Sequence, residues 1–336
     1  MNDDQLIDSL VDTFGTFDDL YVSRDFVKRG EIEPLLIEPW SESGWANWRP
    51  IRDSVSKDAL DPVNRNLPGP LPSLFVLLLR TYRWYEIDVG RIRLLSNLSP
   101  APLSFCGEAA ADRHLFEAIS RVNSVQFGRG PDVDYDPVCF DLRSRGQDDD
   151  CRIVKFDHEE ILCNDRIVEV GEVAPSFRAL VQLAIDDAKV ERTVRSLQGS
   201  ELVRAAGRLA ELTDAERGYL VQAFGREVDV ANRQRAIAIV RQTTAPLTVP
   251  LLAAGLRDPD PAVWADALEA LFCMAPLELR PLLRDVRAQE IGYAETYGDS
   301  KVREIVGAAF ADRAVASSAA KVQAIDAALR KLGDSA

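Results

Sequence analysis

The sequence predicts an α+β domain followed by an all-α domain, and three observations lead to this fold class. Segments rich in Val, Ile and Phe crowd residues 123–172 in short strand-like runs. Segments with apolar residues at helical spacing stand before and after them. Beyond about residue 195 the strand pattern ends, and helical segments alternate with short polar breaks. We therefore predict an α+β domain over residues 1–192 and an α-helical domain over residues 193–336.

Composition indicates a folded, water-soluble protein, because 46% of the 336 residues are hydrophobic and 28% are charged. The longest apolar run, residues 74–79, is far shorter than the about 20 residues that cross a bilayer. The opening residues, MNDDQLIDSL, are acidic and lack the basic start and apolar core of a secretory signal. We expect a cytoplasmic protein with no membrane partner.

The net charge of −14 is concentrated in the predicted α+β domain. Residues 196–336 carry 17 basic and 19 acidic side chains, so a charge of −12 belongs to residues 1–195. Residues 131–172 alone hold 13 acidic and 5 basic side chains. Such a surface repels nucleic-acid phosphates and attracts basic proteins. The charge pattern predicts a basic protein partner and no nucleic-acid partner.

Three tryptophans, Trp40, Trp45 and Trp48, stand close together in EPWSESGWANWRPI. Spacings of five and three residues do not define a helix, and the Pro, Ser and Gly residues around them predict an irregular segment. The rings either pin this segment to the core or form an exposed aromatic patch for a partner. Both interpretations stay open, and the three residues are candidate binding residues.

The next elements alternate between helix and strand. Pro72 and Ser73 are suited to the start of a helix, and the apolar spacing that follows predicts a buried amphipathic helix. Residues 89–98 are typical of one short strand, and residues 111–122 of a second helix. The single His114 of that helix is assigned no chemistry.

The middle of the chain predicts an antiparallel meander closed by a helix. We expect short strands over residues 124–130, 137–145, 151–158, 159–164 and 166–171. Asp157 and His158 would form one turn, and Asn164-Asp165 a tight hairpin turn. A helix over residues 174–190 would then close the domain.

The helical half contains a repeat. Residues 229–240 superpose on residues 260–271 with a shift of 31, and a looser copy covers residues 298–310. In the first two copies an Asp precedes a helix, and a small residue, Ala236 or Ala267, allows close packing of helices. Such units cannot bury their apolar faces alone, so we expect them to stack into a solenoid. They resemble short HEAT-type repeats.

The cysteines predict neither disulfides nor a zinc site. The five residues form an odd set with no CxxC pair: Cys106, Cys139, Cys151, Cys163 and Cys273. Structural zinc sites and thioredoxin-type motifs both use that pair. We expect the thiols to be reduced and mostly buried.

Four segments of the first domain together resemble the SUKH superfamily of SMI/KNR-type domains. They are LPGPLPSLFVLLLRTY, VCFDL, RIVKFDHEEIL and VAPSFRALVQLAID. Leu71-Pro72 and residues 176–180 occupy the places of the family's LP dipeptide and its SFxxFL-like helix start. The resemblance covers about residues 30–190. It implies an antiparallel sheet with flanking helices, a protein-binding role, and no catalytic residue or cofactor. Bacterial members resemble toxin-neutralising immunity proteins, and eukaryotic relatives resemble regulatory hubs.

The acidic stretch from Val133 to Leu162 admits three interpretations. Its acids and His158 would suit a metal-dependent hydrolase, but the EF-hand order and the HExxH spacing are absent. Adjacent side chains on a strand end also diverge. The acids would otherwise be solvated turns of a structural hairpin, or a rim that attracts a basic protein. The candidate rim residues are Asp148, Asp149, Asp150, Asp157, Glu159 and Glu160.

We conclude from the sequence that the protein is a non-enzymatic binding module without metal or cofactor. The predicted role is that of an immunity-type protein that neutralises a basic toxin or effector. The alternative is a regulatory adaptor that docks a complex through its helical repeats. A metal-dependent hydrolase remains as a third hypothesis.

Overall fold

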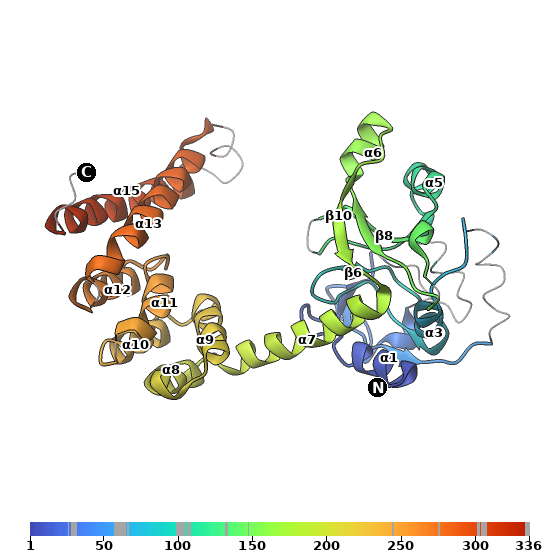
Figure 1. The fold of residues 1–336 in the computed structure, drawn as a ribbon, viewed down its shortest axis with the longest axis horizontal. Helices are drawn as coiled ribbons and strands as arrows, with labels where there is room; N and C mark the ends of the chain where they lie inside the picture. Colours follow the sequence, from blue (N-terminus) through green and yellow to red (C-terminus); the bar gives the residue numbers. More distant parts are fainter. Residues whose placement is uncertain are drawn as a thin grey trace. The chain divides into compact units, whose positions relative to one another are not determined.

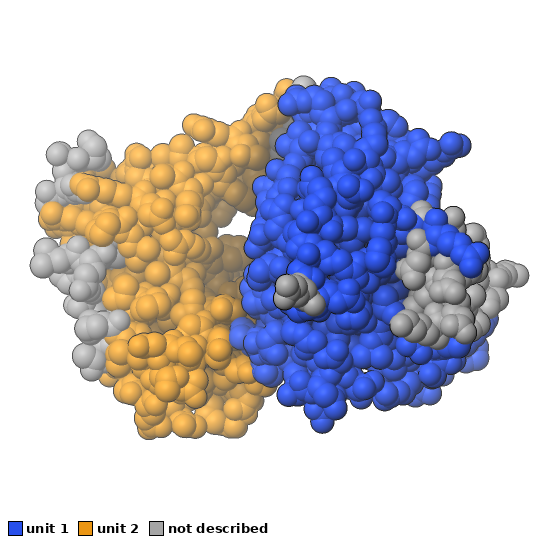
Figure 2. Space-filling view, turned by 45° about the vertical axis from the view of Figure 1, so that its right-hand side comes forward, with its two compact units in different colours: residues 1–192 blue, residues 193–336 orange. Residues whose placement is uncertain are grey.

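The computed structural model divides the chain into two compact units, residues 1–192 and residues 193–336 (Figures 1 and 2). It describes the chain except residues 26, 28–31, 57–64, 66, 99–104, 106–108, 132–133, 147, 244, 275, 301–302, 304–307 and 333–336. The first unit holds the strands and the second is helical, which confirms the predicted α+β class followed by an all-α region.

The first unit is organised by a six-stranded antiparallel sheet in the order β10-β9-β8-β7-β6-β5. Neighbours in the sheet are consecutive in the chain, so the predicted meander is confirmed. The strands are β5 (Ile87–Asp88), β6 (Arg93–Leu94), β7 (Ser124–Arg129), β8 (Pro137–Asp141), β9 (Ile153–Phe156) and β10 (Glu169–Ala174). Two register shifts interrupt the β9–β10 pairing, and such irregularities make an edge strand a poor template for aggregation.

Helices cover both faces of this sheet. Phe140 of β8 faces the main core, where its ring stacks 4.0 Å from that of Phe127 and lies 5.0 Å from that of Phe75 on α3 (Ser73–Thr81). The preceding residue of the strand, Cys139, faces a second core with Ile119 of α5 (Arg113–Arg121). Because side chains alternate across a strand, β8 is buried on both faces.

The remaining elements of the first unit enclose the main core. The helices α1 (Asp3–Val11) and α7 (Phe177–Ser196) contribute buried apolar side chains to it, although α7 continues past the boundary between the units. Two small antiparallel pairs complete the unit: β1 (Tyr21–Ser23) with β2 (Trp45–Asn47), and β3 (Ile51–Arg52) with β4 (Tyr82–Arg83). Short 3₁₀ turns occur at Glu33–Leu35 and Leu142–Ser144.

Three local predictions were wrong. Residues 159–164 belong to a helix, α6 (His158–Asn164), and not to a strand. The Asp157 carboxylate accepts the Glu160 amide at 2.9 Å, which begins the helix, and Asp165 ends it in the left-handed conformation with φ 48°. Residues 89–98 contain β6 but also the turn of a hairpin, because Gly90 has φ +90° and allows β5 to pair with β6. The tryptophan segment is not irregular throughout, since Trp45 lies in β2.

The second unit consists of helices with short connections. They are α8 (Ser200–Gly207), α9 (Asp214–Arg226), α10 (Val230–Val240), α11 (Ala245–Gly255), α12 (Pro261–Met274), α13 (Pro276–Gly298) and α15 (Ala308–Lys331), with a 3₁₀ turn at Leu209–Glu211. The helix α10 packs against α8 and α12, and α11 packs against α9 and α12. The helices α13 and α15 pack along each other (Figure 1). This arrangement is a stack of neighbouring helices.

The two closest copies of the repeat share their local structure. Asp229 accepts the Ala231 amide at 2.8 Å at the start of α10, and Asp260 accepts the Ala262 amide at 2.9 Å at the start of α12. Ala236 and Ala267 are fully buried. A Cβ atom added to Gly255 of α11 would lie only 2.8 Å from the Ala267 Cβ of α12. The helices α11 and α12 can therefore approach closely because both residues are small. The looser copy at residues 298–310 lies largely outside the described residues.

Three cysteines fall within the described residues, and all are free thiols. Cys139 and Cys151 are buried, as expected, and burial raises the pKa of the Cys151 thiol to about 12. Cys163 on α6 is exposed. Cys106 and the Cys273 side chain lie outside the described part.

Replacing Ala267 with Leu tests the close packing of the helices in the second unit. The larger side chain has no space against Gly255, so we expect a loss of about 1–3 kcal/mol in the free energy of unfolding. Urea unfolding followed by circular dichroism measures it. Ala265→Leu, on the exposed face of the same helix, is the matched control. Equal stability of the two variants would contradict the close contact.

Candidate functional site

The six acids predicted to form one rim lie in two separate places in the first unit. Asp148, Asp149 and Asp150 precede β9, whereas Asp157, Glu159 and Glu160 follow it. A strand advances about 3.3 Å per residue, so β9 separates the two groups. Figure 1 shows α6, which carries the second group, at the opposite end of the strands from the start of α7. The six acids therefore do not lie together, and whether either group binds a partner stays a prediction.

Asp150 does not belong to an exposed surface at all. It is 9% exposed, and its carboxylate accepts the backbone amides of Cys151 at 2.8 Å, Phe177 at 2.9 Å and Arg178 at 3.0 Å. The last two amides belong to the first turn of α7, where backbone N–H groups have no carbonyl acceptor within the helix. The Asp150 carboxylate therefore stabilises the start of α7 and is not available to contact a partner.

Most of the other predicted acids are also occupied. Asp149 forms an ion pair with Arg145, and Glu160 lies 3.4 Å from Arg166. Asp157 begins α6. Asp148 and Glu159 are exposed, and no partner is found for either among the described residues. Local pairing therefore leaves few of the predicted acids free to contact a partner, although the net charge of the segment is unchanged.

The three tryptophans do not form one exposed patch. Trp48 is 1% exposed and meets the Tyr85 ring edge-on at 6.1 Å, so it belongs to the core. Trp40 is partly buried against the same core. Only Trp45 is exposed, at 49%. The interpretation of rings that pin a segment to the core applies to Trp40 and Trp48.

A cluster that sequence reasoning missed surrounds His158 at the start of α6. Asp136, just before β8, accepts the His158 amide at 3.0 Å and lies 2.8 Å from the His158 Nδ1. The ligand atoms of Asp136, Asp157 and His158 all lie within 4.8 Å of one another. Asp136 is distant from His158 in the sequence, so no local pattern could reveal the contact.

A cation of the protein already lies beside this cluster and partly neutralises it. The Lys155 ammonium lies 3.0 Å from Asp134 and 3.4 Å from Asp136. The Asp157 carboxylate is engaged by the Glu160 amide. A divalent ion would have to compete with both contacts. The geometry therefore supports an ion-paired surface more than the metal-dependent hydrolase that we weighed from the sequence.

The pKa values in the cluster follow this pairing. Burial would raise the pKa of Asp136, but hydrogen bonds from His158 and the Lys155 charge outweigh it, so the pKa is lowered. The hydrogen bond with Asp134 raises the pKa of Lys155. Both charges are thus maintained at neutral pH.

An exposed tyrosine packs against the His158 ring of this cluster. Tyr135 is 56% exposed, yet the Arg129 guanidinium lies 5.1 Å from the centre of its ring, and the His158 ring meets it edge-on at 6.1 Å. Arg129 is in turn paired with Glu86 at 2.9 Å. We use the name Tyr135 face for Glu86, Arg129, Asp134, Tyr135, Asp136, Lys155 and His158. The only sequence signal for it is the polar segment DVDYDP between two strands.

Comparison with known proteins identifies no relative of this chain. No protein-family model, no curated protein and no solved structure matches it. None of the helices in the described part combines the length and the apolar character that a membrane span needs. The resemblances to SUKH domains and HEAT repeats therefore stay predictions.

Asp150→Ala tests the capping role of this buried carboxylate. Three backbone amides would lose their acceptor, so we expect a loss of about 2–3 kcal/mol in the free energy of unfolding, measured in urea. Asp148→Ala, two residues away and exposed, is the matched control and should change stability by less than about 0.5 kcal/mol. Similar losses in both variants would contradict the assignment.

Asp136→Asn tests the ion-paired cluster through its pH dependence. The pKa of Asp136 is lowered in the folded protein, so its ionised form stabilises the fold above its ordinary pKa, and this stabilisation is lost as pH falls through the folded value. We expect the variant to lose about 1–3 kcal/mol at pH 7. The difference from the original protein should shrink steadily below about pH 4. A difference independent of pH between 7 and 3 would contradict the charge pairing.

Proposed function

We propose that the first unit binds a basic protein through the Tyr135 face. The observation that supports it is an exposed aromatic ring held in one position by protein contacts on two sides. Tyr, Trp and Arg dominate the binding energy of protein interfaces. A ring already held by Arg129 and His158 loses little conformational entropy on binding.

The paired charges around Tyr135 are better suited to recognising one particular partner than to attracting basic proteins in general. Glu86, Asp134 and Asp136 are balanced largely by Arg129 and Lys155, so a partner meets satisfied groups rather than unpaired buried charges. The long-range attraction comes from the charge of −12 on residues 1–195. Such a field raises the association rate with a basic partner and depends on salt.

The role that we propose for this binding is immunity-type neutralisation of a basic toxin or effector in the cytoplasm. Many nucleases and other effectors that act on nucleic acids are basic, so they have the required charge. The resemblance of the first unit to SUKH domains agrees with this role. The stacked helices of the second unit favour a regulatory adaptor as the second candidate, because such stacks offer extended surfaces for partners.

Tyr135→Ala tests the proposed binding face in an affinity capture from the native cell. We expect the original protein to capture a basic protein that is released as salt rises, and the variant to bind that protein at least about tenfold more weakly. Surface plasmon resonance with the identified partner measures the affinity. Expression of the partner alone should harm the cell if the immunity role is right, and should be harmless if the protein is an adaptor.

Tyr21→Ala is the matched control, because Tyr21 is also exposed, at 51%, but lies on β1. It should leave the affinity within about twofold. Capture of an acidic partner, or equal weakening by both variants, would reject the Tyr135 face as the binding site.

A further inference from the structure

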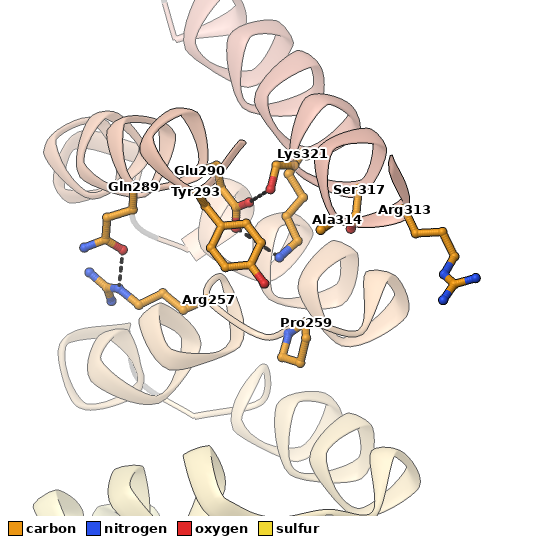
Figure 3. Close-up of a pocket in the computed structure, with 10 residues that line it drawn as sticks. Arg257, Pro259, Gln289, Glu290, Tyr293, Arg313, Ala314, Ser317 and Lys321 are labelled. Carbon is orange, nitrogen blue, oxygen red and sulfur yellow. Dashed lines mark hydrogen bonds and ion pairs between the residues drawn. The ribbon is translucent and has the colours of Figure 1, made fainter. Parts of the chain in front are cut away.

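A cleft of about 570 Å³ opens within the second unit between α13, α15 and the turn that joins α11 to α12 (Figure 3). This volume is within the range of ligand-binding pockets. The turn contributes Arg257 and Pro259. The helix α13 contributes Gln289, Glu290 and Tyr293.

The wall from α15 is a polar stripe. Arg313, Ser317 and Lys321 follow one another at intervals of four residues, which places them on one face of the helix. Ala314 also lines the cleft, and its small side chain fills little of it.

Among the described residues that line the cleft, Glu290 is the one carboxylate, and it is already satisfied. Glu290 accepts the Ser318 hydroxyl at 2.7 Å and the Lys321 ammonium at 3.1 Å. Lys321 also donates to the Asp258 carbonyl at 2.8 Å and is 7% exposed. This buried network makes the floor of the cleft rigid and close to neutral.

The rim of the cleft carries two arginines. Arg257 lies at one end, where it is partly exposed and pairs with Asp285 at 2.7 Å. It also donates to Gln289 Oε1 and to the Ala253 carbonyl, both at 3.3 Å. Arg313 lies at the other end, is exposed, and has no acidic partner among the described residues. Figure 3 shows Tyr293 between these two guanidinium groups. Tyr293 is 46% exposed, and its ring lies 4.6 Å from that of Tyr297.

We propose that this cleft binds an extended acidic segment of a protein. One carboxylate of the segment pairs with Arg313, and a second joins Asp285 on the partly exposed Arg257. An apolar or aromatic side chain between them packs on Tyr293 and Pro259. Two separated guanidinium groups fit an extended chain with spaced carboxylates better than one compact anion. The segment has the opposite charge from the partner of the Tyr135 face, so the two sites bind different chemical classes. The proposal does not rest on the proposed function of the first unit.

The experiment uses the full chain and a fluorescein-labelled peptide of sequence EELYEELYEE, with KKLYKKLYKK as the charge-reversed probe. Fluorescence anisotropy at 50 mM NaCl should show saturable binding of the acidic peptide and much weaker binding of the basic peptide. Arg313→Glu should weaken binding of the acidic peptide about tenfold. Tyr293→Ala should weaken it several-fold.

Arg235→Glu is the matched control, because Arg235 is an exposed arginine on α10 outside the cleft. It should leave the affinity within about twofold, since it makes the same change in net charge. Equal weakening by Arg313→Glu and Arg235→Glu would overturn the proposal, as would preferential binding of the basic peptide. Displacement of the peptide by inorganic phosphate at the same concentration as by unlabelled peptide would also overturn it, because the cleft would then bind a compact anion.

Discussion

The buried carboxylate of Asp150 is the interaction on which the architecture of the first unit depends. It joins the loop between β8 and β9 to the first turn of α7 through the amides of Phe177 and Arg178. The Phe177 side chain then enters the main core, with its ring centre 5.2 Å from that of Phe75 and 5.6 Å from that of Phe140. One polar contact thus sets where α7 begins, and the aromatic contacts hold it against the sheet.

Pairing of carboxylates within the fold also explains why the number of acidic residues does not tell how many of them are free at the surface. An isolated carboxylate is costly to bury, so buried acids such as Asp88, Asp141 and Asp150 have amides or a cation as partners. Asp141 pairs with Arg143 at 2.7 Å and with Arg152 at 2.8 Å, while Asp136 is engaged by His158 and Lys155. In the function that we propose, the broad negative field attracts the basic partner, and specific contacts such as those of Tyr135 recognise it.

Prediction from local sequence patterns failed where the same residues are compatible with both a strand and a helix. Residues 159–164 contain β-compatible Ile and Cys, yet Asp157 followed by Glu160 is also a helix start. Tertiary contact decides between them, because Ile161 on α6 packs in the second core with Ile119 and Phe156. Asp136 could not be assigned to His158 from the sequence at all, since 22 residues separate them and only the pairing of β8 with β9 brings them together.

The sequence by itself determined the class of fold, the antiparallel meander of the first unit, and the Asp and small-residue pattern of the stacked helices. These features depend on periodicity and on short-range capping, both of which act between residues a few positions apart. Only the tertiary structure decided which acids are free, which tryptophan is exposed, and where the Tyr135 face and the cleft beside Tyr293 lie. Those features depend on contacts between distant segments, such as that between Lys321 and the Asp258 carbonyl, which no local pattern encodes.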